Sequence, residues 1–440
     1  MQLSEKQQLA FNKYILGENI FITGAGGTGK SELIKKIVES SKNFNKNIQV
    51  CALTGCAALL LKCGAKTIHS WAGIGLANKD QESIIRSTFN NKYKKKRWKS
   101  VDILIIDEVS MMSKQLFELL EAIGRKCRKN ENYFGGIQVI FSGDFFQLPP
   151  ISNSENEDDH KFCFESELWN KVFSSQIYFT KIFRQQENIY AKILNQIRCG
   201  KISKNSIQKL SQCINKKYDS GCIVPTKLFP TKIKVNKLNN KEMSVLKNEE
   251  FKFEIQKCSE DELSLSEQDK EIMKFVTNDM REHEYNFLKN NINCEQNIIL
   301  KVGAQVMCIV NLDMDSEKPI CNGSQGIIKG FNYKNNPIVE FKNGGVKTIG
   351  PHIWQHESFP GIAIKQIPLI LAWALTIHKS QGSTLDCAEI DIGSGIFECG
   401  QTYVALSRVK SLDGLYLKSF DVNKIKVNKK VCNFYNLLQI

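Results

Sequence analysis

A glycine-rich segment, GAGGTGKS from Gly24 to Ser31, constrains the fold of this chain more than any other feature. It follows an apolar run, Asn19 to Thr23, and precedes an amphipathic stretch, Ser31 to Ser40. In this strand–loop–helix context, the pattern G-x-x-x-x-G-K-[ST] wraps the phosphates of a nucleotide. The sequence therefore predicts an ATP site in which Lys30 contacts the β- and γ-phosphates and Ser31 ligates magnesium. The other residues expected to contact ATP here are Gly24, Ala25, Gly26, Gly27, Thr28 and Gly29.

Short apolar runs alternate with helical patterns through the first half of the chain. Strands that alternate with helices predict an α/β fold with a parallel sheet covered on both faces. The expected strands are Asn19 to Thr23, Ile48 to Thr54, Ile103 to Asp107 and Ile137 to Ser142. The clearest helical patterns are Ser31 to Ser40 and Lys114 to Cys127.

Two further segments have the residues that a phosphate-cleaving site requires. In IIDEVSMM, an apolar strand ends in Asp107, predicted to hold the magnesium shell, and Glu108, predicted to orient and deprotonate water. In GDFFQLPP, the amide of Gln147 can sense a γ-phosphate. An Arg from elsewhere would stabilise the charge in transit; Arg184 in IFRQ and Arg408 in TYVALSRVK are the candidates, although residue type alone favours surface positions for both.

Composition bounds the partner and the compartment. The formal net charge of +14 favours a polyanionic partner, nucleic acid above all, although a Lys- and Asn-rich composition from an AT-rich genome is an equal alternative. None of the 15 cysteines forms a C-x-x-C pair, which argues against a zinc finger and favours a reducing compartment. We find no targeting leader, and the longest apolar stretch, Ile367 to Ile377, is too short to span a bilayer. We therefore expect an intracellular protein of the nucleus or cytoplasm, without membrane partners.

The pattern changes at several points along the chain. Segment 78–100 interrupts the α/β rhythm with a basic cluster from Lys92 to Lys99, and segment 152–162 is an expected acidic loop. A second α/β pattern begins near Ile177, includes Thr226 to Thr231 and resumes at Ala372. Segment 240–300 is polar and hard to assign, whereas 302–366 has short β-rich runs separated by Gly and Asn turns.

The run from Val101 to Ile151 resembles the PIF (petite integration frequency) helicases almost throughout, including their signature helix, here Ser113 to Lys129. Similar matches cover nearly the whole chain in family order, whereas the related RecD and Dda helicases lack the signature helix. The matching motifs are LSEKQ at Leu3, LTGCAALLL at Leu53, TIHSWAGIG at Thr67, CFES at Cys163, FRQQ at Phe183, NQIRCG at Asn195, LFPT at Leu228, VGAQVM at Val302, NGSQG at Asn322, LAWALTIHKSQGSTLD at Leu371 and QTYVALSRVKSLDGLYL at Gln401.

The resemblance implies a superfamily 1 helicase that moves 5′ to 3′ on single-stranded DNA, with ATP bound between two RecA-like P-loop motor domains. The implied domains are 1–170, with a wedge insertion at 78–100; 171–240 together with 367–440; and an inserted accessory domain, 241–366, that contains a small β-barrel at 302–366. Gln7, Gln381 and Gly382 join the residues assigned above to ATP. The residues assigned to the DNA channel or to its coupling with ATP are Thr54, Gly55, His69, His378, Lys379 and Ser380.

Residue chemistry supports the DNA assignments in part. Thr54 and Gly55 stand at a strand end, where a hydroxyl and exposed N–H groups bind phosphate. His69 and Trp71 can stack on bases, with core packing an equal alternative for Trp71. The Lys92 to Lys99 cluster could contact the backbone of a duplex or fork, or form a solvated face, and Trp98 within it fits a structural role.

We expect a monomer in solution whose partners are single-stranded DNA and fork or quadruplex DNA, acting in replication, repair, recombination or telomere maintenance. Two alternatives stay open: a DNA-dependent ATPase switch that does not unwind, and an RNA helicase.

Overall fold

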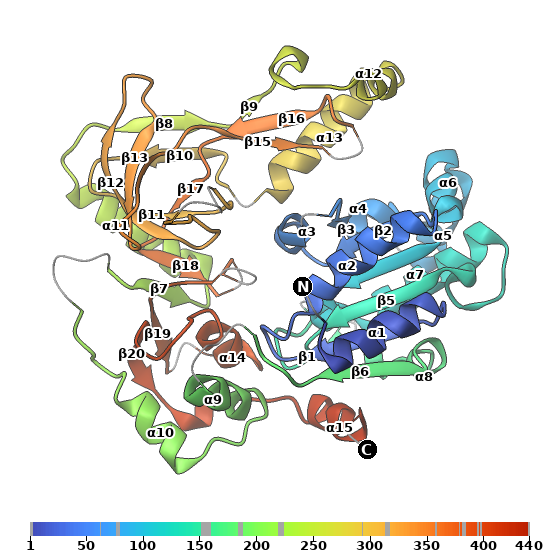
Figure 1. The fold of residues 1–440 in the computed structure, drawn as a ribbon, viewed down its shortest axis with the longest axis horizontal. Coiled ribbons are helices and arrows are strands. Elements are labelled where there is room, and N and C mark those ends of the chain that lie inside the picture. Colours follow the sequence, from blue (N-terminus) through green and yellow to red (C-terminus); the bar gives the residue numbers. More distant parts are fainter. Residues whose placement is uncertain are drawn as a thin grey trace. The chain divides into compact units, whose positions relative to one another are not determined.

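The computed structural model describes residues 3–61, 63–75, 80–150, 160–183, 188–218, 224–292, 294–312, 317–356, 359–377, 379–380, 384–393, 396 and 398–438 (Figure 1). The chain divides into two compact units, considered separately below. Unit 1 comprises Met1–Lys204, Phe397–Ser407 and Val422–Ile440, and unit 2 comprises Asn205–Ile396 and Arg408–Asp421.

Unit 1 is built on a six-stranded parallel sheet in the order β3-β2-β4-β5-β1-β6. The strands are β1 (Ile20–Gly24), β2 (Ile48–Ala52), β3 (Lys66–Thr67), β4 (Ile103–Asp107), β5 (Gln138–Gly143) and β6 (Ser175–Phe179). The four strands predicted in this region are confirmed as β1, β2, β4 and β5. In a parallel sheet with this strand order, the carboxyl ends of β4, β5 and β1 lie side by side at one edge.

Both faces of this sheet are buried, because alternate residues of each strand enter two different cores. Ile20 and Ile22 of β1 pack with α1, α2 and α3, whereas Phe21 faces the opposite core, which contains residues of α4 to α8 and α15. Figure 1 shows these helices around the sheet. Their bounds are α1 (Glu5–Ile15), α2 (Lys30–Asn43), α3 (Gly55–Leu61), α4 (Ile68–Ala72), α5 (Gln81–Asn90), α6 (Lys92–Ser100), α7 (Lys114–Arg128), α8 (Trp169–Val172) and α15 (Lys429–Leu438). Two more helices complete the unit, α9 (Asn188–Arg198) and α14 (Gln401–Leu406).

Unit 2 contains a smaller parallel sheet in the order β18-β7-β19-β20. Its strands are β7 (Thr226–Phe229), β18 (Ala374–Thr376), β19 (Ala388–Ile392) and β20 (Leu415–Phe420). The second α/β pattern is thus confirmed from Thr226 onward. Two parallel sheets with covering helices are the architecture of RecA-like motor domains.

The β-rich runs predicted at 302–366 are present in unit 2, and most belong to a five-stranded antiparallel sheet, β14-β13-β12-β11-β17. The last of these strands lies beyond residue 366, and the strands His352–Gln355 and Ala363–Gln366 join a different sheet. The pairing runs in one line from β14 to β17, so closure into a barrel stays a prediction. Met243 of α11 joins the core of this sheet. The bounds are β11 (Gln305–Cys308), β12 (Gln325–Phe331), β13 (Pro337–Phe341), β14 (Val346–Thr348), β17 (Leu369–Leu371) and α11 (Lys232–Val245).

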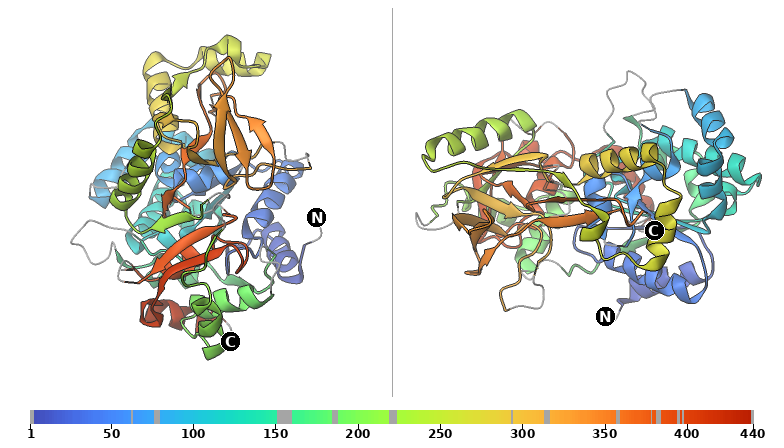
Figure 2. Two further views of the ribbon diagram at one scale, coloured as in Figure 1. Left: turned by 90° about the vertical axis from the view of Figure 1, so that its left-hand side faces the viewer. Right: turned by 90° about the horizontal axis from the view of Figure 1, so that it is seen from above.

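Segment 240–300, which the sequence left unassigned, contains short elements that pair with distant strands. β8 pairs with β10, and β9 joins β15 and β16 in a three-stranded sheet against which α13 packs (Figure 2). The elements within the segment are β8 (Phe251–Glu254), β9 (Gln256–Lys257), α12 (Glu267–Lys274), α13 (Asn278–Asn291) and β10 (Asn297–Leu300). Their distant partners are β15 (His352–Gln355) and β16 (Ala363–Gln366). The remaining α-helix of the chain's described part is α10 (Lys204–Ser211).

The structure differs from the sequence prediction at two domain borders. The strand around Ile177 was expected to begin the second domain, but as β6 it pairs with β1 at the edge of the first sheet. The last residues of the predicted segment 367–440 also return to unit 1 as α15. Both misassignments have one cause, because sheet edges and returning helices are fixed by contacts that are distant in sequence. The predicted acidic loop at 152–162 lies mostly outside the described residues.

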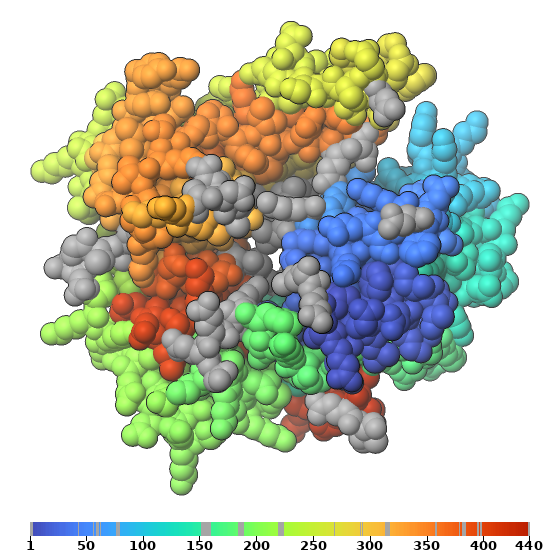
Figure 3. Space-filling model, in the orientation of Figure 1, coloured from blue at the N-terminus to red at the C-terminus, as the bar shows by residue number. Residues whose placement is uncertain are grey.

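Segment 78–100 forms two helices in its described part, α5 and α6, which pack on each other and on α7. The light-blue side chains of this region stand out at the surface of unit 1 (Figure 3). Within the part of the chain that the structure describes, no helix has the length and apolar character needed to cross a membrane.

Candidate nucleotide site and nucleic-acid contacts

The phosphate loop runs between the end of β1 and the start of α2. Gly29, the residue before α2, has φ +80°, a left-handed conformation that glycine adopts without strain. A Cβ atom there would lie 2.5 Å from Nε2 of Gln7, and one on Gly24 would lie 2.6 Å from the carbonyl oxygen of Phe179. The loop is therefore closely enclosed at both ends, and larger residues at these positions would displace its neighbours.

Lys30 lies inside this loop. Its ammonium donates to the carbonyl oxygens of Gly24 at 2.7 Å and Ala25 at 3.1 Å. Burial lowers the pKa of Lys30, and the carboxylates of Asp144, Glu108 and Asp107 oppose that shift. The lysine thus stands where the glycine-rich loop and the acidic strand end meet.

Gln7 packs directly against the loop. It is 4% exposed, its Nε2 donates to the carbonyl oxygen of Gly29 at 3.1 Å, and its Oε1 accepts from the backbone of Ser4 at 2.9 Å. The structure therefore brings Gln7 to the nucleotide loop. Its contact with adenine stays a prediction.

The acidic end of β4 lies beside the first turn of α2. Ser31 Oγ donates to Oδ2 of Asp107 over 3.4 Å, and the backbone N–H of Glu108 donates to Oδ1 of Asp107 at 2.9 Å. Burial raises the pKa of Asp107. A hydroxyl and a carboxylate are hard oxygen ligands, the kind that Mg²⁺ prefers, so these residues fit that ion.

Glu108 has an unusual backbone conformation, with φ +57°. A non-glycine residue in the left-handed region costs about 1–2 kcal/mol, and such residues gather at functional sites. Asp107 is buried and accepts a hydrogen bond from Ser31, whereas Glu108 is partly exposed, so the two carboxylates can have different roles.

Gln147 follows β5, the strand between β4 and β1. Thr23 is the register partner of Gly143, so the phosphate loop and the segment of Gln147 leave adjacent strands at the same level. Gln147 is 6% exposed, and its backbone N–H donates to the carbonyl oxygen of Asp144 at 2.8 Å. The structure thus brings Lys30, Asp107, Glu108 and Gln147 together at one edge of the sheet.

Three residues near this edge were not singled out from the sequence. Arg198 of α9 forms a buried ion pair with Asp144 at 2.8 Å, and the hydroxyl of Tyr435 of α15 lies 3.3 Å from the same carboxylate. Tyr403 of α14 accepts a hydrogen bond from the backbone N–H of Gly26 at 2.9 Å. Arg198 and Tyr403 lie within quoted family motifs, which could have signalled them, whereas Tyr435 follows the last motif.

The structure describes only some of the residues that the sequence assigns to ATP from Arg184 onward. Arg408 belongs to unit 2, is 2% exposed, and its carbonyl oxygen accepts from the backbone N–H of Leu385 at 2.9 Å. The predicted residues that lie outside the described part of the chain are Arg184, His378, Gln381 and Gly382.

The predicted DNA residues of unit 1 surround the end of β2. Thr54 Oγ1 accepts from the backbone N–H of Ala57 at 3.2 Å, so it caps α3, which begins at Gly55. A hydroxyl can accept and donate at the same time, so the same group can also donate to a phosphate. Burial lowers the pKa of His69 of α4, which favours the neutral imidazole.

Trp71 and Trp98 are both core residues. Trp71 is 2% and Trp98 0% exposed, and their ring centroids lie 4.7 Å apart. The indole N–H of Trp98 donates to the carbonyl oxygen of Ala72 at 3.3 Å. The structural reading is therefore confirmed for Trp98, and Trp71 has no exposed face for a base.

In unit 2, Lys379 and Ser380 form a turn after β18. The backbone N–H of Lys379 donates to Oγ1 of Thr376 at 3.0 Å, and Ser380 Oγ donates to the carbonyl oxygen of Ile377 at 2.8 Å. Ser380 is fully buried, which suits a role in coupling better than direct contact with DNA.

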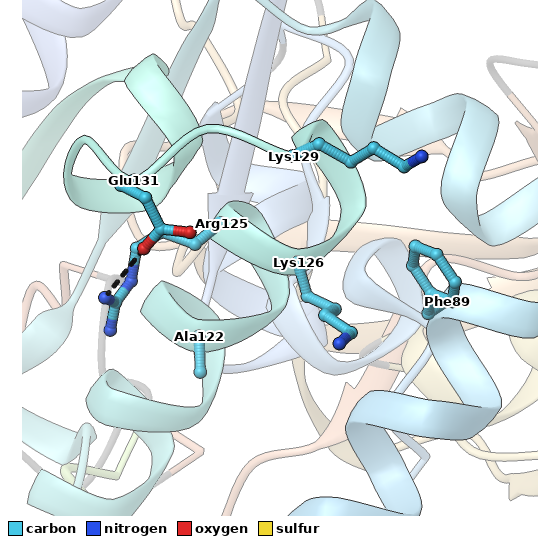
Figure 4. Close-up of a pocket in the computed structure, with 6 residues that line it drawn as sticks. All are labelled: Phe89, Ala122, Arg125, Lys126, Lys129 and Glu131. Atoms are coloured by element: carbon cyan, nitrogen blue, oxygen red, sulfur yellow. Dashed lines mark ion pairs between the residues drawn. The ribbon is translucent and has the colours of Figure 1, made fainter.

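An open basic pocket of about 390 Å³ lies between α5 and α7 (Figure 4). Lys126 extends toward the ring of Phe89, Lys129 points from the end of α7, and Arg125 pairs with Glu131. The ammonium of Lys95, from the basic cluster, lies 3.5 Å from the centroid of Phe89. Lys95 of α6 and Lys126 of α7 therefore both lie near the ring of Phe89 of α5.

The glycine-rich loop, the acidic strand end and the RecA-like sheets are the features of the P-loop class of nucleotide-binding proteins. The family of this chain follows from comparison with known proteins. The family model for PIF1-like helicases matches residues 2–208, and that for the 2B domain of the DNA helicase Pif1 matches residues 285–331. Together with the relatives described next, these matches show that the chain belongs to the PIF1-like helicase family.

The ATP-dependent DNA helicase PIF1 of Xenopus laevis is 36% identical over 445 residues, an alignment that covers 100% of this chain and 65% of that protein. The chain therefore spans somewhat less than two thirds of this relative. The crystal structure of Pif1 helicase from Candida albicans matches with a TM-score of 0.74 and 32% identity, covering 100% of both chains. A Bacteroides Pif1 helicase in complex with ADP-AlF3 and single-stranded DNA matches with a TM-score of 0.65 and 28% identity, covering 100% of this chain and 98% of that one.

Proposed function

We propose that this chain is an ATP-dependent DNA helicase that moves 5′ to 3′ along single-stranded DNA and separates duplex or structured DNA. The observation that carries the proposal is the convergence of Lys30, Asp107, Glu108 and Gln147 at adjacent strand ends of the unit 1 sheet. The Bacteroides relative, described in complex with a nucleotide analogue and single-stranded DNA, supports the same pairing of ligands here.

The residues of unit 1 suit distinct parts of ATP hydrolysis. The loop from Gly24 to Ser31 binds the phosphates through its N–H groups, and Lys30 neutralises their charge. Ser31 and Asp107 hold magnesium, which supplies Lewis-acid stabilisation of the phosphoryl oxygens when bound. Glu108 orients the attacking water and accepts its proton, and Gln147 donates to the γ-phosphate oxygen.

Arg184 and Arg408 complete the proposed site by stabilising the charge of the transferred phosphoryl group. Gln7 selects the nucleotide base, and the Gln381–Gly382 pair contributes from the second motor domain. These assignments rest on the family motifs, as do the proposed wedge insertion at 78–100 and the closure of 302–366 into a small β-barrel.

For DNA, we propose that Thr54, Gly55 and His69 contact the strand from unit 1, and that the 378–380 turn contacts it or couples it to ATP. The basic pocket between α5 and α7 offers a second kind of contact. Lys126 and Lys129 are exposed cations outside the phosphate loop, so they suit the sugar–phosphate backbone of a duplex or fork arm. Sequence-independent contact of this kind fits a motor that must work on any sequence.

The first test is ATP hydrolysis with and without single-stranded DNA. We expect DNA to stimulate turnover in the wild type, and Glu108→Gln to lower kcat by about 10²- to 10⁴-fold, the typical contribution of a general base, while ATP still binds. Glu39→Gln, an equivalent change at an exposed position of α2, is the matched control and should behave like the wild type. Equal turnover in Glu108→Gln and wild type would refute the assigned chemistry. Stimulation by RNA alone would move the substrate from DNA to RNA.

A further inference from the structure

Helix α15 is firmly anchored in unit 1, although the strand that precedes it in the sequence, β20, belongs to unit 2. The chain leaves β20 at Phe420 and enters α15 at Lys429. Phe434 stacks on Phe164 with ring centroids 4.4 Å apart, and Lys430 forms an ion pair with Glu165. Helix α15 therefore belongs to the core on one face of the unit 1 sheet.

The side chain of Tyr435 reaches from α15 to the edge that holds the nucleotide residues. It is 3% exposed, and its ring stacks on Phe146 with centroids 4.6 Å apart. Its hydroxyl lies 2.5 Å from Oγ1 of Thr23, accepts from the backbone N–H of Phe145 at 3.1 Å, and lies 3.3 Å from Oδ1 of Asp144. One buried oxygen thus contacts the end of β1, directly before the phosphate loop, and the loop that follows β5.

Those two segments adjoin the phosphate-binding and sensing residues. Thr23 immediately precedes Gly24, the first residue of the phosphate loop, and Phe145 stands two positions before Gln147. The parallel pairing of β1 with β5 ends at Thr23 and Gly143. Beyond Gly143 the ladder no longer fixes the segment of Gln147, and the hydroxyl of Tyr435 ties that segment, at Phe145, to Thr23, the last paired residue of β1 before the phosphate loop.

The chemistry of the hydroxyl suits a permanent tie. Burial, and then the charge of Asp144, raise the pKa of Tyr435 well above its ordinary value, so the phenol keeps its proton at any physiological pH. A neutral phenol both donates one hydrogen bond and accepts others, which matches three polar neighbours. Because the site is buried, these hydrogen bonds do not compete with bulk water.

We propose that Tyr435 is a positioning residue for ATP hydrolysis, whose hydroxyl fixes the loop of Gln147 relative to the phosphate loop. This inference rests on the ATPase activity proposed above. Tyr435 acts through Thr23 and the backbone of Phe145, so it touches neither the nucleotide nor the water. Its contribution belongs to the hydrolysis step, because the phosphate loop and Lys30 hold the bound phosphates by local contacts that do not involve α15.

The test is Tyr435→Phe, which keeps the ring and its stacking and removes only the hydroxyl. We expect the DNA-stimulated kcat to fall by about tenfold, the effect of one to two net hydrogen bonds on a transition state, with the KM for ATP changed less than about twofold. The matched control is Tyr14→Phe, which also removes a hydroxyl from a buried tyrosine of unit 1, but in the core that contains α1 and α2. Thermal unfolding of each variant identifies a temperature at which all are folded.

A second variant tests the same tie from its other end. Thr23→Val removes the hydroxyl from β1 with little change in shape, and it should reproduce the loss in kcat. Because both changes break one interaction, the double variant should be no slower than the slower single variant. If Tyr435→Phe does not fold, Thr23→Val alone decides the question.

The outcomes separate this inference from the function on which it rests. A wild-type protein without DNA-stimulated turnover would overturn the ATPase proposal and the positioning role together. If the wild type is active and folded Tyr435→Phe keeps the wild-type kcat, the positioning role alone is overturned. Where Tyr435→Phe does not fold, a wild-type kcat in folded Thr23→Val has the same consequence. Losses that add in the double variant, or that Tyr14→Phe matches, would also overturn it.

Discussion

Replacement of Arg198 by Met tests whether the ion pair of Arg198 with Asp144, near the candidate nucleotide site, excludes water as its burial indicates. Arg198 is 1% and Asp144 0% exposed. The guanidinium donates from Nε to both oxygens of Asp144, at 3.1 and 2.9 Å, and from a second nitrogen at 2.8 Å. It also lies 4.4 Å from the centroid of Phe146, between aromatic rings. Burial acts to lower the pKa of Arg198, but the Asp144 charge outweighs it and keeps the guanidinium protonated.

The size of the effect follows from what the substitution leaves behind. Met fills much of the apolar volume of Arg198, so little of the loss comes from packing. The Asp144 carboxylate, however, stays buried without its counter-charge, which costs about 3–5 kcal/mol in other buried ion pairs. Replacing Asp144 by Leu in the same chain removes the stranded charge, so the double variant should be more stable than Arg198→Met.

The assay is urea unfolding at neutral pH, followed by tryptophan fluorescence, to which Trp71, Trp98 and Trp169 of the same core contribute. Lys35→Met is the control, because Lys35 pairs with Glu32 at 2.6 Å but both side chains are more than a third exposed. Breaking that pair should cost no more than about 0.5 kcal/mol. If Arg198→Met costs as little as Lys35→Met, or if the double variant is the least stable, the pair is solvated and the reasoning is wrong.

Three further predictions concern DNA, magnesium and the core. Lys126→Ala and Lys129→Ala should each lower the slope of log K against log salt for forked DNA by about 1, and an unchanged slope would exclude phosphate contacts in the pocket. Because burial raises the pKa of Asp107 and magnesium needs the carboxylate, the KM for Mg²⁺ should rise as pH falls, and the rise should begin above the pH at which an ordinary carboxyl group titrates; a KM that changes only at the ordinary carboxyl pKa would contradict this. Trp98→Ala removes a fully buried ring packed on Trp71 and should lower the free energy of urea unfolding by about 3–5 kcal/mol. A loss below about 1 kcal/mol would mean that Trp98 of α6 is not part of the core.

The sequence predicts the parts of this fold that depend on neighbouring residues. The strands β1, β2, β4 and β5 are short apolar runs, and the helix after the phosphate loop follows from its amphipathic period, so both are found within a few positions. The candidate ATP-site residues of unit 1 are also predictable, because in a parallel sheet the residues that follow each strand end meet at one edge.

What the sequence does not reveal depends on contacts between distant residues. Thr23 and Tyr435 are separated by 412 positions, and no local pattern in α15 distinguishes a tyrosine that reaches the nucleotide site from one that fills a core. β6 was assigned to the wrong domain for the same reason, since an edge strand looks alike in either sheet. For Trp71, the sequence left base stacking and core packing equal, and only the contact with Trp98 decides between them.

The central claim is that this chain is a DNA motor of defined polarity, and unwinding of a forked duplex with only a 5′ single-stranded tail tests it most directly. A duplex with only a 3′ tail and the Lys30→Ala variant are the controls. The account predicts ATP-dependent opening of the 5′-tailed substrate alone, lost in the variant. Opening of the 3′-tailed substrate instead would contradict the polarity, and failure to open either one despite DNA-stimulated ATP hydrolysis would contradict the motor and favour an ATPase switch.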